Sequence, residues 1–362
     1  MSDFYSEKNL SGLKRDNFKR KISGKKTDLF ILSNNKGCEI AATNYAGALL
    51  SIMVPDKYGK FANVIQGHDS IDNVINSPEI YLNTLIGRYG NRISKGEFVL
   101  DGKKYSLATN DAPNHLHGGP SGFHKVVWDA EQTDKQTLKL HYLSVDGEEG
   151  YPGNLDVNVT YKLTDENELL IEYEAVTDKK TIINLTQHAY FNLAGIRHNT
   201  PVILDNILIV NADHYLPIDN KGIPSGRIEH VENTAFDFRT PHRIGERIDD
   251  SSQQTKNGFG YDHCWVLNKR EPEELSLAVK CIEPDSGRTL ECFTTEPGIQ
   301  VYTANHNSGC AGAHGATFPK RSAVCFEAQH LPDSPNKAFY PPVWLAPGQL
   351  YTQTTIYRFG IE

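Results

Sequence analysis

The segment 155–177 reads LDVNVTYKLTDENELLIEYEAVT and contains two runs in which apolar and polar residues alternate. Strict alternation over eight or nine residues is typical of a β-strand that buries one face and leaves the other in water. The polar stretch TDEN separates the two runs, so the segment predicts two neighbouring strands. The apolar faces are formed by Val157, Val159, Tyr161 and Leu163 in the first run and by Leu169, Ile171, Tyr173 and Ala175 in the second.

The same alternation recurs along the chain, with turn residues between the runs. Asp101-Gly102, inside GEFVLDGKKYSLAT (96–109), is the sharpest hairpin signal. A helical pattern is nearly absent: only SIDNVINSPEIYLNTLIG (70–87) has room for one or two short turns, and Pro78 interrupts it. With no repeat and no Pro/Ser-rich linker, this pattern predicts an all-β fold, a single large antiparallel β-sandwich with few short helices. Two sandwich halves fused without a linker would give the same pattern.

Charge and hydropathy disfavour two classes of protein. The 362 residues carry a formal net charge of −8 at pH 7, which argues against a nucleic-acid-binding groove. No apolar run approaches the ~20 residues that span a bilayer, and the first residues lack the apolar core of a secretory signal. The basic stretch 8–26 is poor in apolar residues, so residues 1–26 are predicted to form a flexible arm and residues 27–362 the single domain.

The cysteines indicate a reducing compartment. They include no CxxC pair, and their spacing matches neither a zinc site nor a small disulfide scaffold. We therefore expect free thiols and a cytoplasmic location. The six positions are Cys38, Cys264, Cys281, Cys292, Cys310 and Cys325.

Six short blocks contain polar side chains suited to chemistry, although each block alone is a weak signal. His188 lies in the apolar stretch NLTQHAYFNLAG (184–195), where it is a core histidine, a metal ligand or a proton donor. The blocks are GRYGNRI (87–93), NHLHGG (114–119), TQHAYFNL (186–193), GYDHCW (260–265), EPGIQVYT (296–303) and CFEAQHLPDSPN (325–336).

Several kinds of catalytic site are disfavoured by what these blocks lack. His115-x-His117 has ligand spacing, but no carboxylate follows until Asp129, so no metal is expected; a site built from His117, His188 and Glu327 stays geometrically possible. There is no GxSxG elbow for a nucleophile, no P-loop for a phosphate and no dinucleotide-binding fold. What remains is Arg, Asn, Gln, Asp, His and Glu among aromatic residues, a mixture that suits the hydroxyls and apolar face of a sugar.

The six blocks, in this order, resemble those of the aldose 1-epimerase (galactose mutarotase) family over residues of about 87 to 336. The resemblance implies a β-sandwich, no cofactor and a small aldose as the substrate. It also implies His188 as the general acid and Glu327 as the general base. The remaining implied roles are sugar binding by Asn91, Arg92, His117, Tyr190, Asp262 and Gln300.

Mutarotation needs these residue types, because one group must take the proton of the C1 hydroxyl while another protonates the ring oxygen. With ordinary pKa values of about 4.3 and 6.5, Glu327 would be ionised and His188 partly protonated at pH 7. Two alternatives remain, an isomerase for hexose 6-phosphates and a non-catalytic sugar-binding protein. We expect a monomer or a homodimer, with no nucleic-acid or membrane partner.

Overall fold

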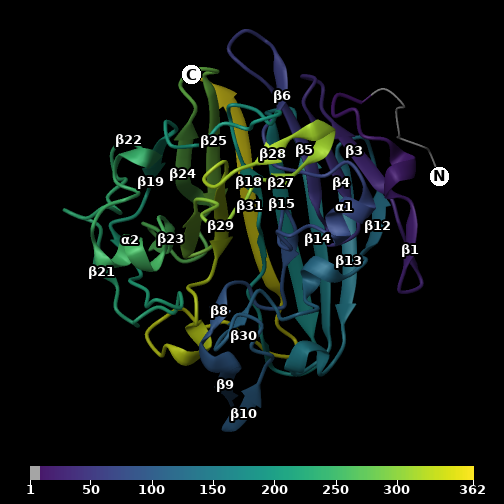
Figure 1. The fold of residues 1–362 in the computed structure, drawn as a ribbon. Coiled ribbons are helices and arrows are strands. Elements are labelled where there is room, and N and C mark those ends of the chain that lie inside the picture. Colours follow the sequence, from purple (N-terminus) through teal and green to yellow (C-terminus); the bar gives the residue numbers. More distant parts are fainter. Residues whose placement is uncertain (1–8) are drawn as a thin grey trace.

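The computed structural model describes residues 9–362, in which almost all of the regular secondary structure is β-strand (Figure 1). Every strand pair within its sheets is antiparallel, as the alternating runs predicted. The largest sheet has nine strands. In order across the sheet these are β12 (Asp129–Gln132), β13 (Thr137–Ser144), β14 (Leu155–Leu163), β15 (Glu168–Thr177), β31 (Tyr351–Ile361), β25 (Arg288–Thr294), β24 (Ser276–Ile282), β19 (Ile207–Val210) and β22 (His242–Arg243).

Two smaller sheets pack on the inner face of the nine-stranded sheet. One has six strands, in the order β18 (Tyr190–Phe191), β29 (Val324–Gln329), β26 (Gly298–Tyr302), β23 (Asp262–Val266), β20 (His214–Tyr215) and β21 (Glu229–His230). The other has four strands, in the order β3 (Leu29–Ser33), β4 (Glu39–Thr43), β5 (Leu49–Pro55) and β6 (Phe61–Asn63). Apolar residues of all three sheets form one core cluster, so the two layers are one β-sandwich.

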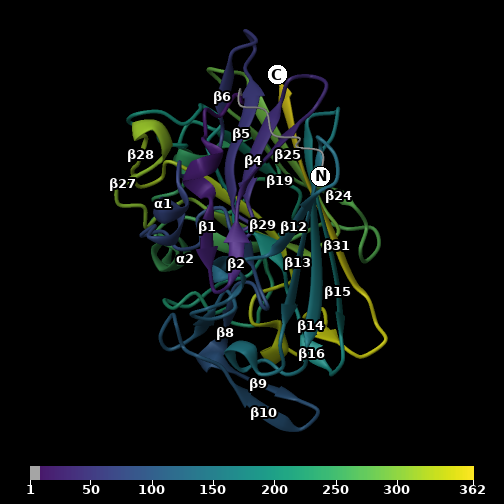
Figure 2. The same ribbon diagram turned by 90° about the vertical axis from the view of Figure 1, so that its right-hand side faces the viewer.

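The segment 155–177 forms β14 and β15 near one side of the large sheet, with the predicted faces. All eight apolar side chains of the two runs are buried, and Asn158 and Lys162 between them are exposed. The Asp101-Gly102 hairpin is confirmed as β9 (Glu97–Leu100) and β10 (Lys103–Ser106). It extends from one end of the molecule, and β6 lies at the opposite end (Figure 2).

Short two-stranded ladders, two short α-helices and seven 3₁₀ helices of three or four residues complete the described fold. The α-helices are α1 (Ile71–Ile75), which Ser70 caps in the segment where a short turn was expected, and α2 (Gln253–Asn257), which Ser252 caps. Within residues 9–362 no helix is long and apolar enough to cross a membrane. The ladders pair β1 (Arg20–Ile22) with β2 (Lys25–Thr27), β7 (Leu85–Ile86) with β17 (Thr186–Gln187), β8 (Arg92–Ile93) with β11 (His115–Leu116), β16 (Thr181–Ile182) with β30 (Trp344–Leu345), and β27 (Cys310–Ala311) with β28 (Thr317–Phe318).

The N-terminal segment differs from the solvated arm that its composition predicted. Its first eight residues lie outside the described part of the chain, but residues 9–27 pack against the four-stranded sheet. Leu13 and Phe18 are buried in an apolar cluster with β3, β4 and β5. The carboxylate of Glu39 also accepts hydrogen bonds from the backbone N–H groups of Leu10 and Ser11. Burial of two apolar side chains thus holds the segment on the sheet in spite of its basic composition. The domain division at residue 26 stays a prediction.

Candidate active site

Three neighbouring strands of the six-stranded sheet carry a row of polar side chains. Gln300 on β26 lies directly opposite Glu327 on β29, so the two side chains share one face of the sheet. Asp262 on β23 is two residues from Cys264, which lies opposite Gln300, so the Asp262 side chain emerges on the same face. The period of two along each strand therefore brings three polar groups together that are widely separated in sequence.

His188 reaches this row from the chain that leads into β18. Its backbone N–H donates to the carbonyl of Thr84, and its carbonyl accepts from the N–H of Asn83. The side-chain oxygen of Asn83 accepts from the N–H of Tyr190, so the backbone is held on both sides of His188. The Tyr190 ring stacks on the imidazole, with centroids 5.0 Å apart. Tyr190 therefore orients His188; its predicted contact with a sugar stays a prediction.

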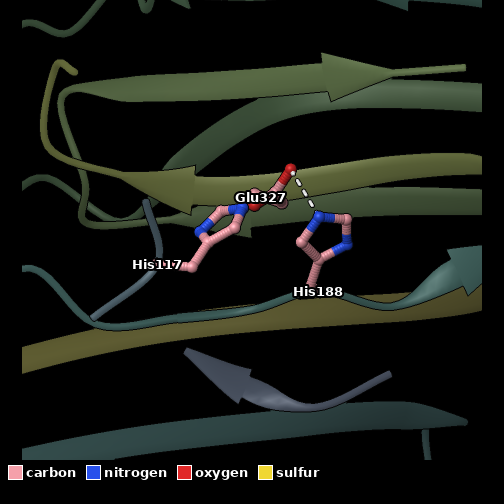
Figure 3. Close-up of side chains that lie close together, drawn as sticks. All are labelled: His117, His188 and Glu327. Atoms are coloured by element: carbon pink, nitrogen blue, oxygen red, sulfur yellow. Dashed lines mark ion pairs between the residues drawn. The ribbon is translucent and has the colours of Figure 1, made fainter. Parts of the chain in front are cut away.

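His188 and Glu327 form a buried pair (Figure 3). Nε2 of His188 lies 3.6 Å from Oε1 of Glu327, and the side chains are only 6% and 2% exposed. The second carboxylate oxygen of Glu327 and Nδ1 of His188 have no hydrogen-bond partner among residues 9–362. The separation is too long for a direct hydrogen bond but short enough for both groups to reach one small ligand.

The tautomer of His117 follows from its contact with Asn91. The backbone N–H of Asn91 donates to Nδ1 of His117 at 3.1 Å, and the N–H of His117 donates back to the carbonyl of Asn91. Burial lowers the pKa of His117 well below its ordinary value, and the positive charge of Arg92, with that of His188 when it is protonated, acts in the same direction. Because neutral His117 accepts at Nδ1, its proton lies on Nε2, and the ring is a hydrogen-bond donor there.

Arg92 is held by two carboxylates. Its Nε donates to Asp111 at 2.8 Å, and its guanidinium lies 4.0 Å from Asp262. Burial lowers the pKa of Arg92, but Asp262 and Asp111 outweigh it and raise the pKa above its ordinary value. Arg92 is therefore a fixed positive charge beside Asp262 at the edge of the cluster. Its remaining N–H groups can donate hydrogen bonds to a ligand.

Asp262 and Gln300 form a second fixed unit beside the pair. Nε2 of Gln300 donates to Oδ1 of Asp262 at 2.7 Å, whereas Oε1 of Gln300 has no partner within the described chain. This hydrogen bond fixes which way the amide faces, so Gln300 presents an acceptor toward the site. A carboxylate, an amide oxygen and a guanidinium side by side match the donors and acceptors of sugar hydroxyls.

Burial reverses the charge states that ordinary pKa values predicted for the pair. It raises the pKa of Glu327 well above its ordinary value; Asp262 raises this pKa further and Arg92 opposes the shift. Burial lowers the pKa of His188 to about 4. Both shifts favour a neutral pair in which Glu327 holds the single proton, instead of a carboxylate beside an imidazolium.

Ligand atoms of His117, His188 and Glu327 lie within 4.8 Å of one another, as a metal site would require. The donor chemistry does not fit a metal ion. Nδ1 of His117 is occupied by the N–H of Asn91, and its Nε2 carries the proton, so neither nitrogen offers a free lone pair. The trio is therefore better suited to hydrogen bonding and proton transfer.

All eight residues named from the sequence lie in one continuous cluster, and two further residues complete it. Tyr81 makes an edge contact with the ring of His117 at 4.7 Å and lies parallel to that of His188 at 6.3 Å. Asp111 orients Arg92. Sequence reasoning missed both, because Tyr81 sits in an irregular segment and Asp111 precedes the NHLHGG block; their only signal was proximity to the quoted blocks.

The fold and this cluster define the class of the protein as the galactose mutarotase-like β-sandwich. The structure of the GalM/aldose epimerase homologue from C. elegans superimposes with a TM-score of 0.85 at 27% identity, covering 92% of this chain and 99% of that one. The galactose 1-epimerase structure from Lactobacillus acidophilus NCFM superimposes with a TM-score of 0.82 at 29% identity, covering 94% and 97%.

Sequence comparison identifies the family within this class. The family model for aldose 1-epimerase matches residues 28–358. Galactose mutarotase from Mus musculus is 41% identical over 326 residues, which cover 90% of this chain and 89% of the relative. Aldose 1-epimerase from Escherichia coli K12 is 34% identical over 345 residues, covering 92% and 95%. The chain belongs to the aldose 1-epimerase family.

Proposed function

We propose that the protein interconverts the α and β anomers of free hexoses such as galactose and glucose, with Glu327 as general base and His188 as general acid. The buried His188–Glu327 pair carries this proposal, because pure sugar binding needs no acid and base 3.6 Å apart. The names of the relatives support the same activity. The reaction needs no redox step and no covalent intermediate, so no cofactor is part of the proposal.

The geometry suits ring opening and closure. The two oxygens that exchange protons, the C1 hydroxyl and the ring oxygen, are bonded to the same carbon, so acid and base must lie next to each other. Glu327 takes the hydroxyl proton, His188 protonates the ring oxygen, and the bond between C1 and that oxygen breaks. After rotation about C1–C2 the two residues exchange roles, and the ring closes on the other face.

The pair contains one proton whichever residue holds it. In the free protein, burial favours the proton on Glu327. Sugar hydroxyls that donate to the Glu327 carboxylate stabilise its charged form, as does the guanidinium of Arg92. We propose that binding shifts the proton to His188 and so prepares the acid and the base together.

The surrounding residues are proposed to position the sugar. Nε2–H of His117 and the guanidinium of Arg92 would donate to sugar oxygens and stabilise negative charge that develops there. Asp262 and Gln300 would accept from hydroxyls, and Asn91 would keep His117 in its donor tautomer. Tyr190 would contribute by holding the His188 ring and by lining the sugar site.

Replacement of Glu327 by Gln tests the proposal, because the amide keeps the size and loses the basicity. We expect kcat for α-glucose or α-galactose, followed by polarimetry, to fall by roughly 10²–10⁴-fold. Binding of the corresponding methyl glycoside, which cannot open, should change far less. Full activity in this variant would show that Glu327 is not the general base.

Glu296→Gln is a matched control, because Glu296 is also buried and paired with a histidine, His330, at 2.6 Å. It lies outside the cluster, so we expect turnover close to that of the unmodified protein. Measuring glucose against glucose 6-phosphate with the same enzyme tests the alternative substrate class: a preference for the phosphate would overturn the proposal for free hexoses.

We also propose a cytoplasmic location and a monomeric or homodimeric state. The location is supported by the cysteines, all of which are free thiols and most of which are buried. Light scattering after size-exclusion chromatography measures the oligomeric state, and a mass above that of a dimer would contradict it.

A further inference from the structure

Two histidine side chains lie next to each other at the edge of the six-stranded sheet, away from the cluster around Glu327. His214 on β20 is directly opposite His230 on β21, and their ring centroids are 4.3 Å apart, with 38° between the ring planes. β21 is the last strand of this sheet and lies at the margin of the molecule (Figure 1). Three strand spacings of about 4.8 Å separate β20 from β29, so the histidine pair is roughly 14 Å or more from Glu327.

The hydrogen-bond pattern of this ladder brings the two side chains close together. The backbone N–H of Val231 donates to the carbonyl of Asp213, which is the pattern of a hydrogen-bonded cross-strand pair. His214 and His230, the next pair along, are therefore a non-hydrogen-bonded pair. In such pairs the Cα atoms are about 4.5 Å apart, and the side chains leave the same face of the sheet at their closest approach. The backbone itself thus sets the two imidazole rings side by side.

Both imidazoles have ring nitrogens free for a ligand. Within residues 9–362 neither ring makes a hydrogen bond or an ion pair with another side chain or with the backbone. His214 is half-buried and His230 is exposed, so an ion from solvent can reach the pair. A neutral imidazole offers one nitrogen lone pair, and two imidazoles together suit Zn²⁺, Cu²⁺ or Ni²⁺.

The spacing of the two rings fits a shared metal ion. An ion about 2.0–2.1 Å from one nitrogen of each ring, with an angle of about 90–109° between the two bonds, places the ring centroids about 4.5–5.2 Å apart. The observed 4.3 Å is shorter than this range by a few tenths of an ångström, roughly what a small rotation of the exposed His230 ring supplies. The pair therefore has the geometry of a bidentate chelate.

The loop between the two histidines reaches the candidate active site. It covers residues 216–228, between the end of β20 and the start of β21. A Cβ on Gly222, whose φ is 74°, would lie 2.7 Å from Cζ of Arg92, so the loop backbone packs directly against the guanidinium. An ion shared by His214 and His230 would join the two ends of the loop that packs on Arg92.

We propose that His214 and His230 form a chelating site for a divalent transition-metal ion, Zn²⁺ or Cu²⁺, at the base of this loop. The site involves neither the catalytic pair nor a sugar, so it does not depend on the proposed function. The two histidines are its protein ligands, and water fills the remaining coordination positions. A clip across the ends of a loop restricts the unfolded chain, and an ion that binds the folded protein stabilises it by mass action.

Calorimetric titration of the chelator-treated protein with ZnCl₂ and with CuCl₂ tests the site. We expect saturable binding of one ion, tighter for Cu²⁺ than for Zn²⁺, and loss of this binding in His214→Ala and in His230→Ala. At a metal concentration about a hundred times Kd, the Tm of the unmodified protein should rise by about 2–4 °C. His198→Ala removes a single exposed histidine and is the matched control, in which binding and the rise in Tm should both remain.

Unchanged binding in either His214→Ala or His230→Ala would overturn the proposal, as would a failure of the unmodified protein to bind both ions. If binding is lost in His188→Asn and kept in His230→Ala, the ion lies at the catalytic cluster and the proposal also fails. The electron paramagnetic resonance spectrum of bound Cu²⁺ is a second readout: splitting by imidazole nitrogens should be present in the unmodified protein and absent in His230→Ala. All of these measurements are made without sugar, so they are independent of the outcome of the anomer-exchange assay.

Discussion

Glu327 and His188 have opposite pKa shifts, and these decide the pH range in which the pair holds a single proton. Below a pH of about 4 both residues are protonated and no base is left, because burial lowers the pKa of His188 to that value. Above the raised pKa of Glu327 neither residue is protonated and no acid is left. The acid limb of the activity profile thus belongs to the imidazole and the alkaline limb to the carboxyl, the reverse of the order that ordinary values give.

We therefore expect the profile of kcat/KM against pH to be a bell with its acid limb near pH 4 and its alkaline limb at the raised pKa of Glu327. Ordinary pKa values would confine it to the narrow interval between about 4.3 and 6.5. The measurement is anomer exchange in the free sugars from pH 4 to 10. An alkaline limb at pH 6.5, the ordinary pKa of histidine, would contradict this expectation. It would show that burial does not set the pKa values that govern catalysis.

For single residues, the sequence pointed to His188 and Glu327 as a pair but did not predict their protonation states. The resemblance pointed to His188 and Glu327 by their blocks, and the structure brings the two together. Their pKa values depend on burial and on Asp262 and Arg92, which lie far away along the chain. No local pattern contains that information, and burial favours charge states opposite to those assumed from free side chains.

The ladder between β8 and β11 positions two site residues, Arg92 and His117, on segments with little regular structure around them. Gly118, directly after His117, has a φ of 84°, and a Cβ there would lie 1.8 Å from the carbonyl oxygen of Gly87. Two backbones thus approach each other closely behind His117, and only glycine fits between them.

Gly118→Ala is expected to displace His117 and lower kcat/KM by about 10- to 100-fold, with a loss of thermal stability. Gly147→Ala is the matched control: its φ is 86°, but nothing lies within 4 Å of the added Cβ. The control should lose about 1–2 kcal/mol through its left-handed conformation alone and keep its activity. If both substitutions change kcat/KM equally, the close approach of Gly118 to Gly87 does not position His117.

The positions and buried faces of single strands were the most predictable features of the fold. The alternation in 155–177 predicted both strands and both faces, because each strand needs only its own period of two to define an inside and an outside. Strand order was not predictable. Gln300 and Glu327 face each other because β26 and β29 are paired, whereas β14 and β15 lie in another sheet; such pairings follow from the packing of the whole core.

For the whole molecule, the N-terminal segment is the clearest departure from the sequence interpretation. Composition predicted a solvated arm over residues 1–26, whereas Phe18 is fully buried and Leu13 nearly so. Averages over a basic stretch hide single apolar residues, and the surface that receives them is built from β3, β4 and β5. The described part of this segment, from residue 9 onward, therefore packs against the four-stranded sheet.

Phe18→Ala tests this placement. Removal of a fully buried phenylalanine ring is expected to destabilise the protein by about 3–5 kcal/mol, measured as a fall in Tm. Lys21→Ala, at an exposed position in the same segment, should stay within about 0.5 kcal/mol of the unmodified protein. If Phe18→Ala leaves the stability unchanged, the segment is a solvated arm, as its composition predicted.

The unsatisfied carboxyl of Glu327 has a thermodynamic consequence for the chain as a whole. Unfolding returns this group to water, where it ionises freely, so every increase in pH above its solution pKa favours the unfolded state until the folded pKa is reached. If Glu327 is the general base that we propose, catalysis and conformational stability compete at this one side chain. Glu327→Gln should therefore lose the part of this pH dependence of stability that belongs to the carboxyl.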